Sequence, residues 1–241
     1  MDLNDALKEG GRHATGGAGS KRLRHALVTA EVAVSLVLLV GAGLLVKSFR
    51  QLSRVDAGFD PRGVLTLRLR LPDAKYPEPA QSMNFLREVV RRVAALPGVE
   101  GVSVATGFPL GRVQDQSYTL EGEPEPQRPA DWASAVSHSI GEGYYRALGI
   151  RLLAGRDFDA RDTGDSPRVV IVDESFARRH FPGRPPAAAL GKRLRFGGEG
   201  EPWREIVGVV GHVRQAGLDA PSTTQVYRPW TQIGRRSLRP R

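Results

Sequence analysis

Residues 26–46 form an apolar run, ALVTAEVAVSLVLLVGAGLLV, that contains one charged side chain, Glu31. Twenty-one residues of α-helix, at about 1.5 Å per residue, span roughly 31 Å, which matches the hydrocarbon thickness of a bilayer. A core helix of a soluble domain would carry a polar face along its whole length, whereas the polar side chains here lie in the first half of the run. We therefore predict a transmembrane helix over 26–46.

A cleaved export signal is the main alternative, because Lys21, Arg22 and Arg24 precede the run and small residues at 41–43 lie before Lys47. The apolar part of a signal peptide is about 7 to 15 residues long and lies close to the N-terminus. This run is longer and follows a 25-residue segment. These differences favour a helix that is retained in the mature protein.

The position of Glu31 is compatible with a structural role. A carboxylate within a bilayer is a candidate functional residue, and a proton relay is one alternative. Glu31 is the sixth residue of the run, so its carboxylate can reach the headgroups or face another helix. We favour this structural interpretation over a proton relay.

The flanking charges give a small preference for a cytoplasmic N-terminus. Residues 11–25 carry four Lys/Arg side chains, and residues 47–61 carry three. The chain has no cysteine, which fits an envelope domain without disulfides and a cytosolic domain equally well.

Composition argues against a nucleic-acid partner. The net charge is +9, but residues 47–234 contain 26 basic and 22 acidic side chains, and the stretch 235–241 alone adds four arginines. Such a balance is typical of an ordinary solvated surface rather than a basic binding face.

Downstream of the helix, apolar patterning predicts mixed strands and helices. Strands are expected over 64–71, 101–108, 132–140, 168–172, 192–196, 203–214 and 225–230, and helices over 77–99 and 174–181. A short helix is also expected at the start of the chain, ending at Gly10 and Gly11, and the membrane helix is expected to continue to about Ala57 and Gly58. Asp173 is the expected N-cap of the last helix. The elements over 64–108 would form a βαβ unit. This order of elements favours the α+β class.

Catalytic motifs are absent from the sequence. The stretch TGGAGSKR (15–22) resembles a phosphate-binding loop only superficially and is predicted to belong to a flexible linker over 13–22. The five histidines, at 13, 25, 138, 180 and 212, show no metal-binding spacing. Ser103 lacks the second glycine of a nucleophile elbow, and Asp157 and Asp159 are better explained as turn-capping carboxylates than as an acid pair. No catalytic, cofactor-binding or metal-ligating residue is predicted.

Six stretches carry a family resemblance: EVAVSLVLLVGAGLLVKSF, VDAGFDP, YYRALGIRLLAGRDF, VVIVDESFARRHFPG, LGKRLRF and WREIVGVVGHVR. They resemble the permeases of the MacB-like and FtsX-type ABC transporter family, especially its duplicated acidobacterial members. The resemblance implies a cytoplasmic N-terminus, one membrane span and a periplasmic core domain with a βαβ-rich lobe and a second mixed lobe. It also implies a separate nucleotide-binding ATPase, whose cycle moves the helices and, through them, the periplasmic domain.

From the patterns and the resemblance we expect five parts: a cytoplasmic segment with a basic linker over 1–25, the transmembrane helix over 26–46, a stalk over 47–62, the core domain over 63–232 and an Arg-rich tail over 233–241. The family would re-enter the membrane after residue 232, so we expect a truncated permease or a partner that supplies the missing spans. His212 stands where the resemblance leads us to expect an acidic residue.

The predicted function is a non-enzymatic permease-type subunit in the bacterial inner membrane. Its expected partners are the bilayer, a nucleotide-binding ATPase, and another permease half or a second copy of the chain; nucleic acid is not among them. A stand-alone, membrane-anchored binding or sensing module is the alternative. A tethered hydrolase that uses Ser103 or the Asp157/Asp159 pair is the third and weakest hypothesis.

Leu38→Arg tests the membrane span. An arginine near the middle of the run is expected to cost about 2.5 to 3.5 kcal/mol of insertion free energy. Carbonate extraction of isolated membranes should therefore release more of this variant than of the parent protein. Equal retention of the two proteins would contradict the span.

Overall fold

The computed structural model describes residues 18–52, 55–72, 74–111, 114–124, 126, 128, 131–198, 200–215 and 223–232. It divides the chain into two units, Met1–Val55 and Asp56–Arg241, which are described separately. The predicted short helix at the start of the chain and the Arg-rich tail over 233–241 lie outside the described residues.

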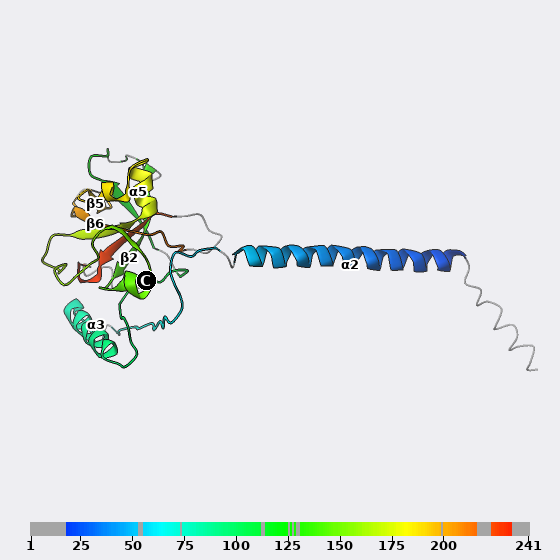
Figure 1. The fold of residues 1–241 in the computed structure, drawn as a ribbon, viewed down its shortest axis with the longest axis horizontal. Helices are drawn as coiled ribbons and strands as arrows, with labels where there is room; N and C mark the ends of the chain where they lie inside the picture. Colours follow the sequence, from blue (N-terminus) through cyan, green and yellow to red (C-terminus); the bar gives the residue numbers. More distant parts are fainter. Residues whose placement is uncertain are drawn as a thin grey trace, which may run out of the picture. The chain divides into compact units, whose positions relative to one another are not determined.

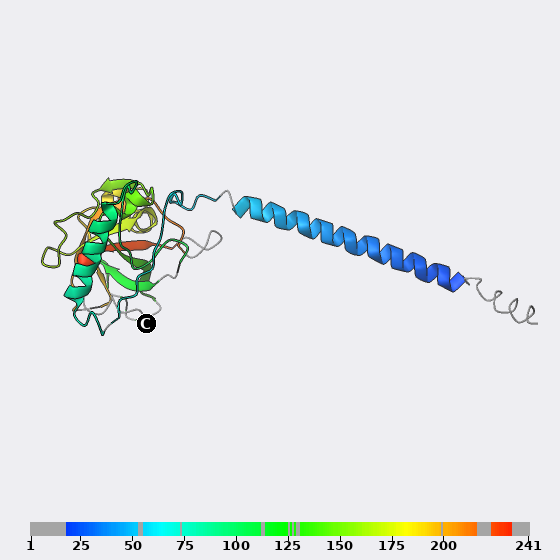
Figure 2. The same ribbon diagram turned by 90° about the horizontal axis from the view of Figure 1, so that it is seen from below.

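The first unit contains one long helix, α2 (Ala18–Leu52), which is continuous in both views (Figures 1 and 2). The most apolar part of its segment Lys21–Leu52 has a mean hydropathy of 2.2, and none of that part is buried. The helix is therefore long and apolar enough to cross a membrane. The helix predicted over 26–46 is confirmed, but the flexible linker expected over 13–22 is wrong from Ala18 onward. Lys and Arg are good helix formers, so the basic residues extend the helix rather than interrupt it.

The helix also ends before the predicted boundary near Ala57 and Gly58, since α2 extends to Leu52 and Val55 lies outside the helix. The Val55 amide still donates a hydrogen bond to the Leu52 carbonyl at 3.1 Å. The backbone then turns at Gly58, whose φ of 81° lies in the left-handed region.

The second unit is built on a mixed sheet with strand order β3-β6-β4-β7-β2-β1-β5. Its strands are β1 (Asp115–Leu120), β2 (Ala133–Ile140), β3 (Leu152–Gly155), β4 (Val169–Asp173), β5 (Arg193–Phe196), β6 (Arg204–Val210) and β7 (Gln225–Pro229). An additional β5–β6 pairing closes six of these strands into a barrel and leaves β3 attached to β6. The β2–β7 and β4–β6 pairs are parallel and the others antiparallel. The predicted α+β class is confirmed.

Residues of all six barrel strands form the interior core. They alternate along a strand, since successive side chains point to opposite faces, except in β6, where the pairing with β4 is irregular after Ile206. These residues are Tyr118, Leu120, Ala135, Val170, Val172, Leu194, Phe196, Ile206, Val209 and Val226. The helix α5 (Glu174–His180) follows β4 and adds Phe176 and Ala177 to this core (Figure 1). It therefore covers the end of the barrel at which β4 finishes.

A second core covers the outer face of β4, β7 and β2. It combines Ile140, Ile171 and Tyr227 from these strands with Tyr144 and Tyr145 of α4 (Tyr144–Ala147). Two short 3-10 helices, η2 (Pro186–Ala189) and η3 (Trp230–Gln232), complete the described elements of the barrel region. The strands predicted over 132–140, 168–172, 192–196 and 225–230 and the helix after Asp173 are thus confirmed with small changes of boundary. The strand predicted over 203–214 ends at Val210, and β1 and β3 are not among the predicted strands.

The predicted βαβ unit is only partly present. Its helix is confirmed as α3 (Pro79–Ala94), but neither 64–71 nor 101–108 forms a strand. Leu65 and Leu67 are 95% and 79% exposed, and only Ala105 of the second segment makes a bridge, to Ile140. A strand needs a neighbour for its backbone groups, and residues 101–108 bridge β2 only at Ile140, beyond the residues 133–136 that pair with β1.

His138 in β2 makes the stability of the barrel dependent on pH. Its side chain is buried, and burial lowers its pKa from 6.5 to about 4, so the folded protein keeps it neutral. The unfolded chain binds a proton at higher pH than the folded protein, so this contribution is present above about pH 6.5 and is lost as pH falls towards 4.

We expect the wild-type free energy of unfolding to fall, between pH 7 and pH 5, by about 2 kcal/mol more than that of His138→Asn. Urea titrations of the full chain in detergent at the two pH values measure this difference. Parallel pH dependence of the two proteins would contradict the assignment to His138.

Candidate functional site

A buried carboxylate, Asp173, joins several elements at the covered end of the barrel. Its side chain is fully buried. One oxygen accepts hydrogen bonds from the backbone amides of Phe176 and Gln225, both at 3.0 Å. The other accepts from Ser175 Oγ at 2.6 Å and His212 Nδ1 at 2.5 Å. Asp173 therefore caps α5, as the sequence predicts, and also connects it to β7 and to the segment that follows β6.

Gln225 extends this network into the segment after β6, which we call the 211–215 loop. Its side-chain amide donates to the Val213 carbonyl, and its carbonyl accepts from Tyr227 Oη at 2.6 Å and from Gln215 Nε2 at 3.1 Å. Burial raises the pKa of Tyr227 well above its ordinary value, so its hydroxyl remains a donor. The 211–215 loop is thus held on the barrel by buried hydrogen bonds.

Residues 56–60, which follow α2 closely in the chain, attach to the same loop. The Arg214 amide donates to the Ala57 carbonyl at 3.0 Å, and the Asp60 amide donates to the Leu148 carbonyl at 2.8 Å. Phe59 packs against the second core and lies edge-on to Phe108, with ring centroids 6.2 Å apart. We call residues 56–60 together with the 211–215 loop the junction.

Gly58 allows the close approach of the two halves of the junction. A Cβ atom at this position would overlap the His212 carbonyl oxygen, and the φ of 81° already disfavours other residues. The Gly58 amide also donates to the Asp56 carboxylate at 2.8 Å. The backbone of residues 56–60 is therefore fixed against the barrel by contacts that only glycine permits.

The contacts of the Asp–His pair differ from those of a hydrolase. In a serine hydrolase the imidazole lies between the serine and the carboxylate and takes the proton from the hydroxyl. Here the carboxylate of Asp173 lies between Ser175 and His212 and accepts from both. Ser175 therefore lacks the activating contact, and the chemistry of this network is positional.

The candidate residues for the hydrolase hypothesis do not come together with this network. The Ser103 hydroxyl makes a 3.5 Å contact with the neighbouring Val104 carbonyl. The Asp159 carboxylate accepts from Arg161 at 2.7 Å, and these hydrogen bonds lower its pKa. Asp157 accepts from the next amide at 2.7 Å, and burial raises its pKa. These contacts are typical of turn-capping carboxylates.

The described histidines occupy separate environments. His180 lies between Tyr118 Oη at 2.7 Å and Glu123 at 3.0 Å, while His138 lies inside the domain and His212 contacts Asp173. His25 belongs to α2, and His13 lies outside the described residues. Within the described part of the chain, no group of three or more His, Cys, Asp or Glu side chains is arranged to hold a metal ion.

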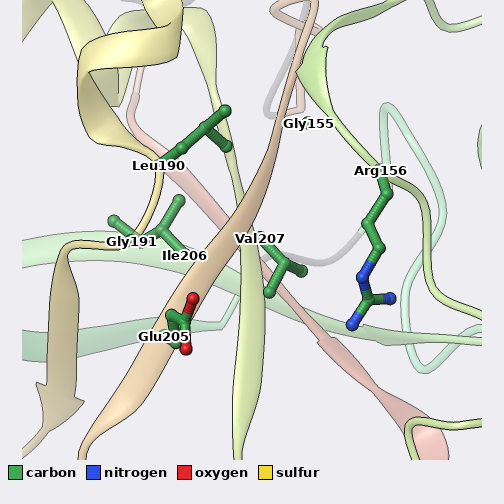
Figure 3. Close-up of a pocket in the computed structure, with 7 residues that line it drawn as sticks. All are labelled: Gly155, Arg156, Leu190, Gly191, Glu205, Ile206 and Val207. Atoms are coloured by element: carbon green, nitrogen blue, oxygen red, sulfur yellow. The ribbon is translucent and has the colours of Figure 1, made fainter.

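An open hollow of about 360 Å³ lies beside β6, at the point where its pairing partner changes from β5 to β3 (Figure 3). It is lined by Gly155, Arg156, Leu190, Gly191, Glu205, Ile206 and Val207. Arg156 and Glu205 lie on different elements with Val207 between them, and the Arg156 guanidinium donates two 2.8 Å bonds to Asp162. The polar groups of the hollow thus have structural roles and do not converge on one point.

Residues 26–241 match the sequence profile of the MacB-like periplasmic core domain. The chain belongs to this family. Over 106 residues it is 34% identical to the macrolide export ATP-binding/permease protein MacB of Rhodopseudomonas palustris (strain BisB18), which covers 44% of this chain and 15% of that protein. Over 94 residues it is 35% identical to the corresponding protein of Mannheimia succiniciproducens, covering 39% and 13%. The chain thus spans only about 15% of the length of the curated relatives it matches.

Two solved structures are similar at a low level. The periplasmic region of MacB from Actinobacillus actinomycetemcomitans aligns at 19% identity with a TM-score of 0.43, covering 64% of this chain and 59% of that one. The extracellular domain of the noncanonic ABC-type transporter YknZ from Gram-positive bacteria aligns at 20% identity with a TM-score of 0.39, covering 59% and 61%.

Gly58→Ala is expected to weaken the junction. Gly63 is a matched control, because its φ is also positive, at 70°, but nothing lies within 4 Å of the position its Cβ would take. We expect Gly63→Ala to lower the free energy of unfolding by about 1 kcal/mol and Gly58→Ala by about 2 kcal/mol more. Urea unfolding of both variants measures the difference, and equal losses would show that the contact with His212 is unimportant.

Asp173→Ser separates the cap of α5 from the wider network. Serine retains the capping function, so a cap alone would be little affected. Because the amide of Gln225 and the ring of His212 lose their acceptor, we expect a loss of about 2 to 4 kcal/mol in the free energy of unfolding. Ser175→Ala removes one donor and is the control, with an expected loss below about 1 kcal/mol. A loss for Asp173→Ser no larger than that of the control would overturn this role.

Proposed function

We propose that this chain is a membrane-anchored periplasmic domain of an ABC transporter permease and that it transmits movement from α2 to the barrel. Membership of the MacB-like family and the exposed apolar helix support the anchored arrangement. The proposed topology has a cytoplasmic N-terminus and a periplasmic barrel in the inner membrane. In this role the chain performs no reaction of its own.

The observation that carries the mechanical part of the proposal is the junction. Residues 56–60 are the first residues of the second unit, and they are bonded to the backbone at Arg214 and Leu148. The 211–215 loop is in turn bonded through Gln225 and His212 to Asp173, at the point where β4, α5 and β7 meet. A pull on residues 56–60 would therefore act on the barrel rather than only on a flexible tether.

The energy for such a movement would come from a nucleotide-binding ATPase. The names of the curated relatives combine ATP binding and permease, whereas these 241 residues contain no GxxxxGK[ST] motif. We therefore propose that polypeptide outside this sequence supplies the ATPase. Another permease half or a second copy of the chain would supply further membrane helices.

The topology is testable because the chain has no cysteine. Single cysteines at Lys21, before the apolar run, and at Arg62, after α2, should react differently with a membrane-impermeant maleimide. We expect Arg62→Cys to be labelled once the outer membrane is opened and Lys21→Cys only after the inner membrane is disrupted. The reverse pattern, or labelling of both sites at the same step, would contradict the proposal.

The functional partner is tested by purifying the full chain from detergent-solubilised membranes and identifying co-purifying proteins by mass spectrometry. Recovery of a nucleotide-binding ATPase is the expected result. Gly58→Ala should still bind this ATPase but should reduce any stimulation of ATP hydrolysis by the chain. Gly63→Ala is the control and should leave both properties unchanged. Recovery of folded protein alone would contradict the proposed partner and favour a stand-alone binding module.

A further inference from the structure

Two arginines point into the barrel at the end opposite to α5. Arg204 shares the interior face of β6 with Ile206, and Arg228 shares that of β7 with Val226, because alternate residues of a strand face the same side. Their strand positions pair close to the start of β4, whereas α5 follows its end. We call this end the open mouth of the barrel.

Both guanidinium groups contact the same aromatic ring. Arg228 lies 4.8 Å and Arg204 lies 5.9 Å from the centroid of Phe196 in β5. Arg204 is only 8% exposed, and Arg228 is half-buried. Because β7 and β5 are three strands apart in the barrel order, the Arg228 side chain must cross the mouth to reach this ring.

The two charges lack a counter-ion among the described residues. Arg204 Nη1 and Arg228 Nε are buried N–H donors without a hydrogen-bond partner. Burial and the neighbouring charge of Arg204 lower the pKa of Arg228 to about 10, and burial and the charge of Arg168 lower that of Arg204. The carboxylate of Glu201 offsets these effects on both groups, but it is exposed and forms no described ion pair with either.

A third unsatisfied donor lies on the same interior face. The Ser137 hydroxyl of β2 is buried and has no described partner, and it is two residues from Ser139, which pairs with Arg228. Contact with Phe196 explains how the guanidinium groups pack, but it does not provide acceptors for their N–H groups. Two like charges against one buried ring are unfavourable unless an anion accompanies them.

We propose that the open mouth of the barrel binds a phosphate group between Arg204 and Arg228. The guanidinium fork matches two oxygens of a phosphate, and a ligand of this charge would compensate both cations. Of the three residues, Arg228 is the most exposed, while Arg204 and Phe196 are buried. Free phosphate and the phosphodiester of a lipid headgroup share this chemistry.

The test is isothermal titration calorimetry of the full chain in a non-ionic detergent at low salt. Inorganic phosphate and glycerophosphoglycerol are the two probes, and acetate is the control anion. Binding of inorganic phosphate would indicate a free ligand, whereas binding of the diester alone would indicate a lipid headgroup. Absence of binding by both probes would overturn the proposal and leave the arginines with a packing role.

The variants distinguish the site from general electrostatic attraction. Arg228→Gln and Arg204→Gln should each weaken phosphate binding at least about tenfold, because each removes charge-assisted hydrogen bonds. Arg184→Gln removes one exposed charge elsewhere and should change the affinity less than about twofold. Glu201→Gln should strengthen binding, since it removes the carboxylate that partly offsets both cations.

Far-UV circular dichroism checks that each variant is folded before titration. If an arginine variant does not fold, Glu201→Gln and the comparison of phosphate with acetate still decide the question. Equal affinities of the parent protein, Arg184→Gln and a folded Arg228→Gln would contradict the proposal. Unchanged or weaker binding by folded Glu201→Gln, or equal binding of acetate and phosphate, would also contradict it.

Discussion

The covered end of the barrel depends on the buried carboxylate of Asp173. A charged group without solvent is tolerated only when hydrogen bonds replace its hydration, and Asp173 accepts four. Those four donors belong to the first turn of α5, to β7 and to the loop after β6. The positions of α5 and of the 211–215 loop therefore depend on one side chain, and the attachment of residues 56–60 depends in turn on that loop.

In the proposed role, this arrangement would let the domain respond to a helix outside it. A closed barrel has no free edge along which its six strands can slide, so load on one connection is shared by the whole sheet. The junction places that load next to the buried hydrogen bonds of Asp173 and Gln225. In the proposed transporter, α2 would move in the membrane and the barrel would follow through backbone hydrogen bonds and a glycine that permits close contact.

The two ends of the barrel differ in their polar chemistry. At the covered end a single negative charge is fully satisfied by donors from the chain. At the open mouth two positive charges contact an aromatic ring, and described N–H groups remain without acceptors. The first pattern is that of a structural node, and the second is that of a site for an external anion. The hydrophobic interior between them separates the two functions.

Local pattern determined much of this protein. The apolar run over 26–46 specified a helix, apolar patterning located β2, β4, β5, β6 and β7, and Asp173 before ESFARRHF specified a capped helix. Each of these depends on neighbours within a few residues, which the sequence displays directly. The alternating segment 64–71 carried the same signal, yet it forms no strand because pairing requires a partner that the pattern cannot supply.

Only the tertiary structure decided the closure of the barrel and the position of the site. The β5–β6 contact, the mouth formed by Arg204 and Arg228, and the junction all combine residues from separate elements. His212 and Gln225 lie 39 and 52 residues from Asp173 in the chain and still bind the same carboxylate. A buried carboxylate accepts hydrogen bonds from the donors that the fold places near it, so its partners depend on the folded arrangement rather than on the local sequence.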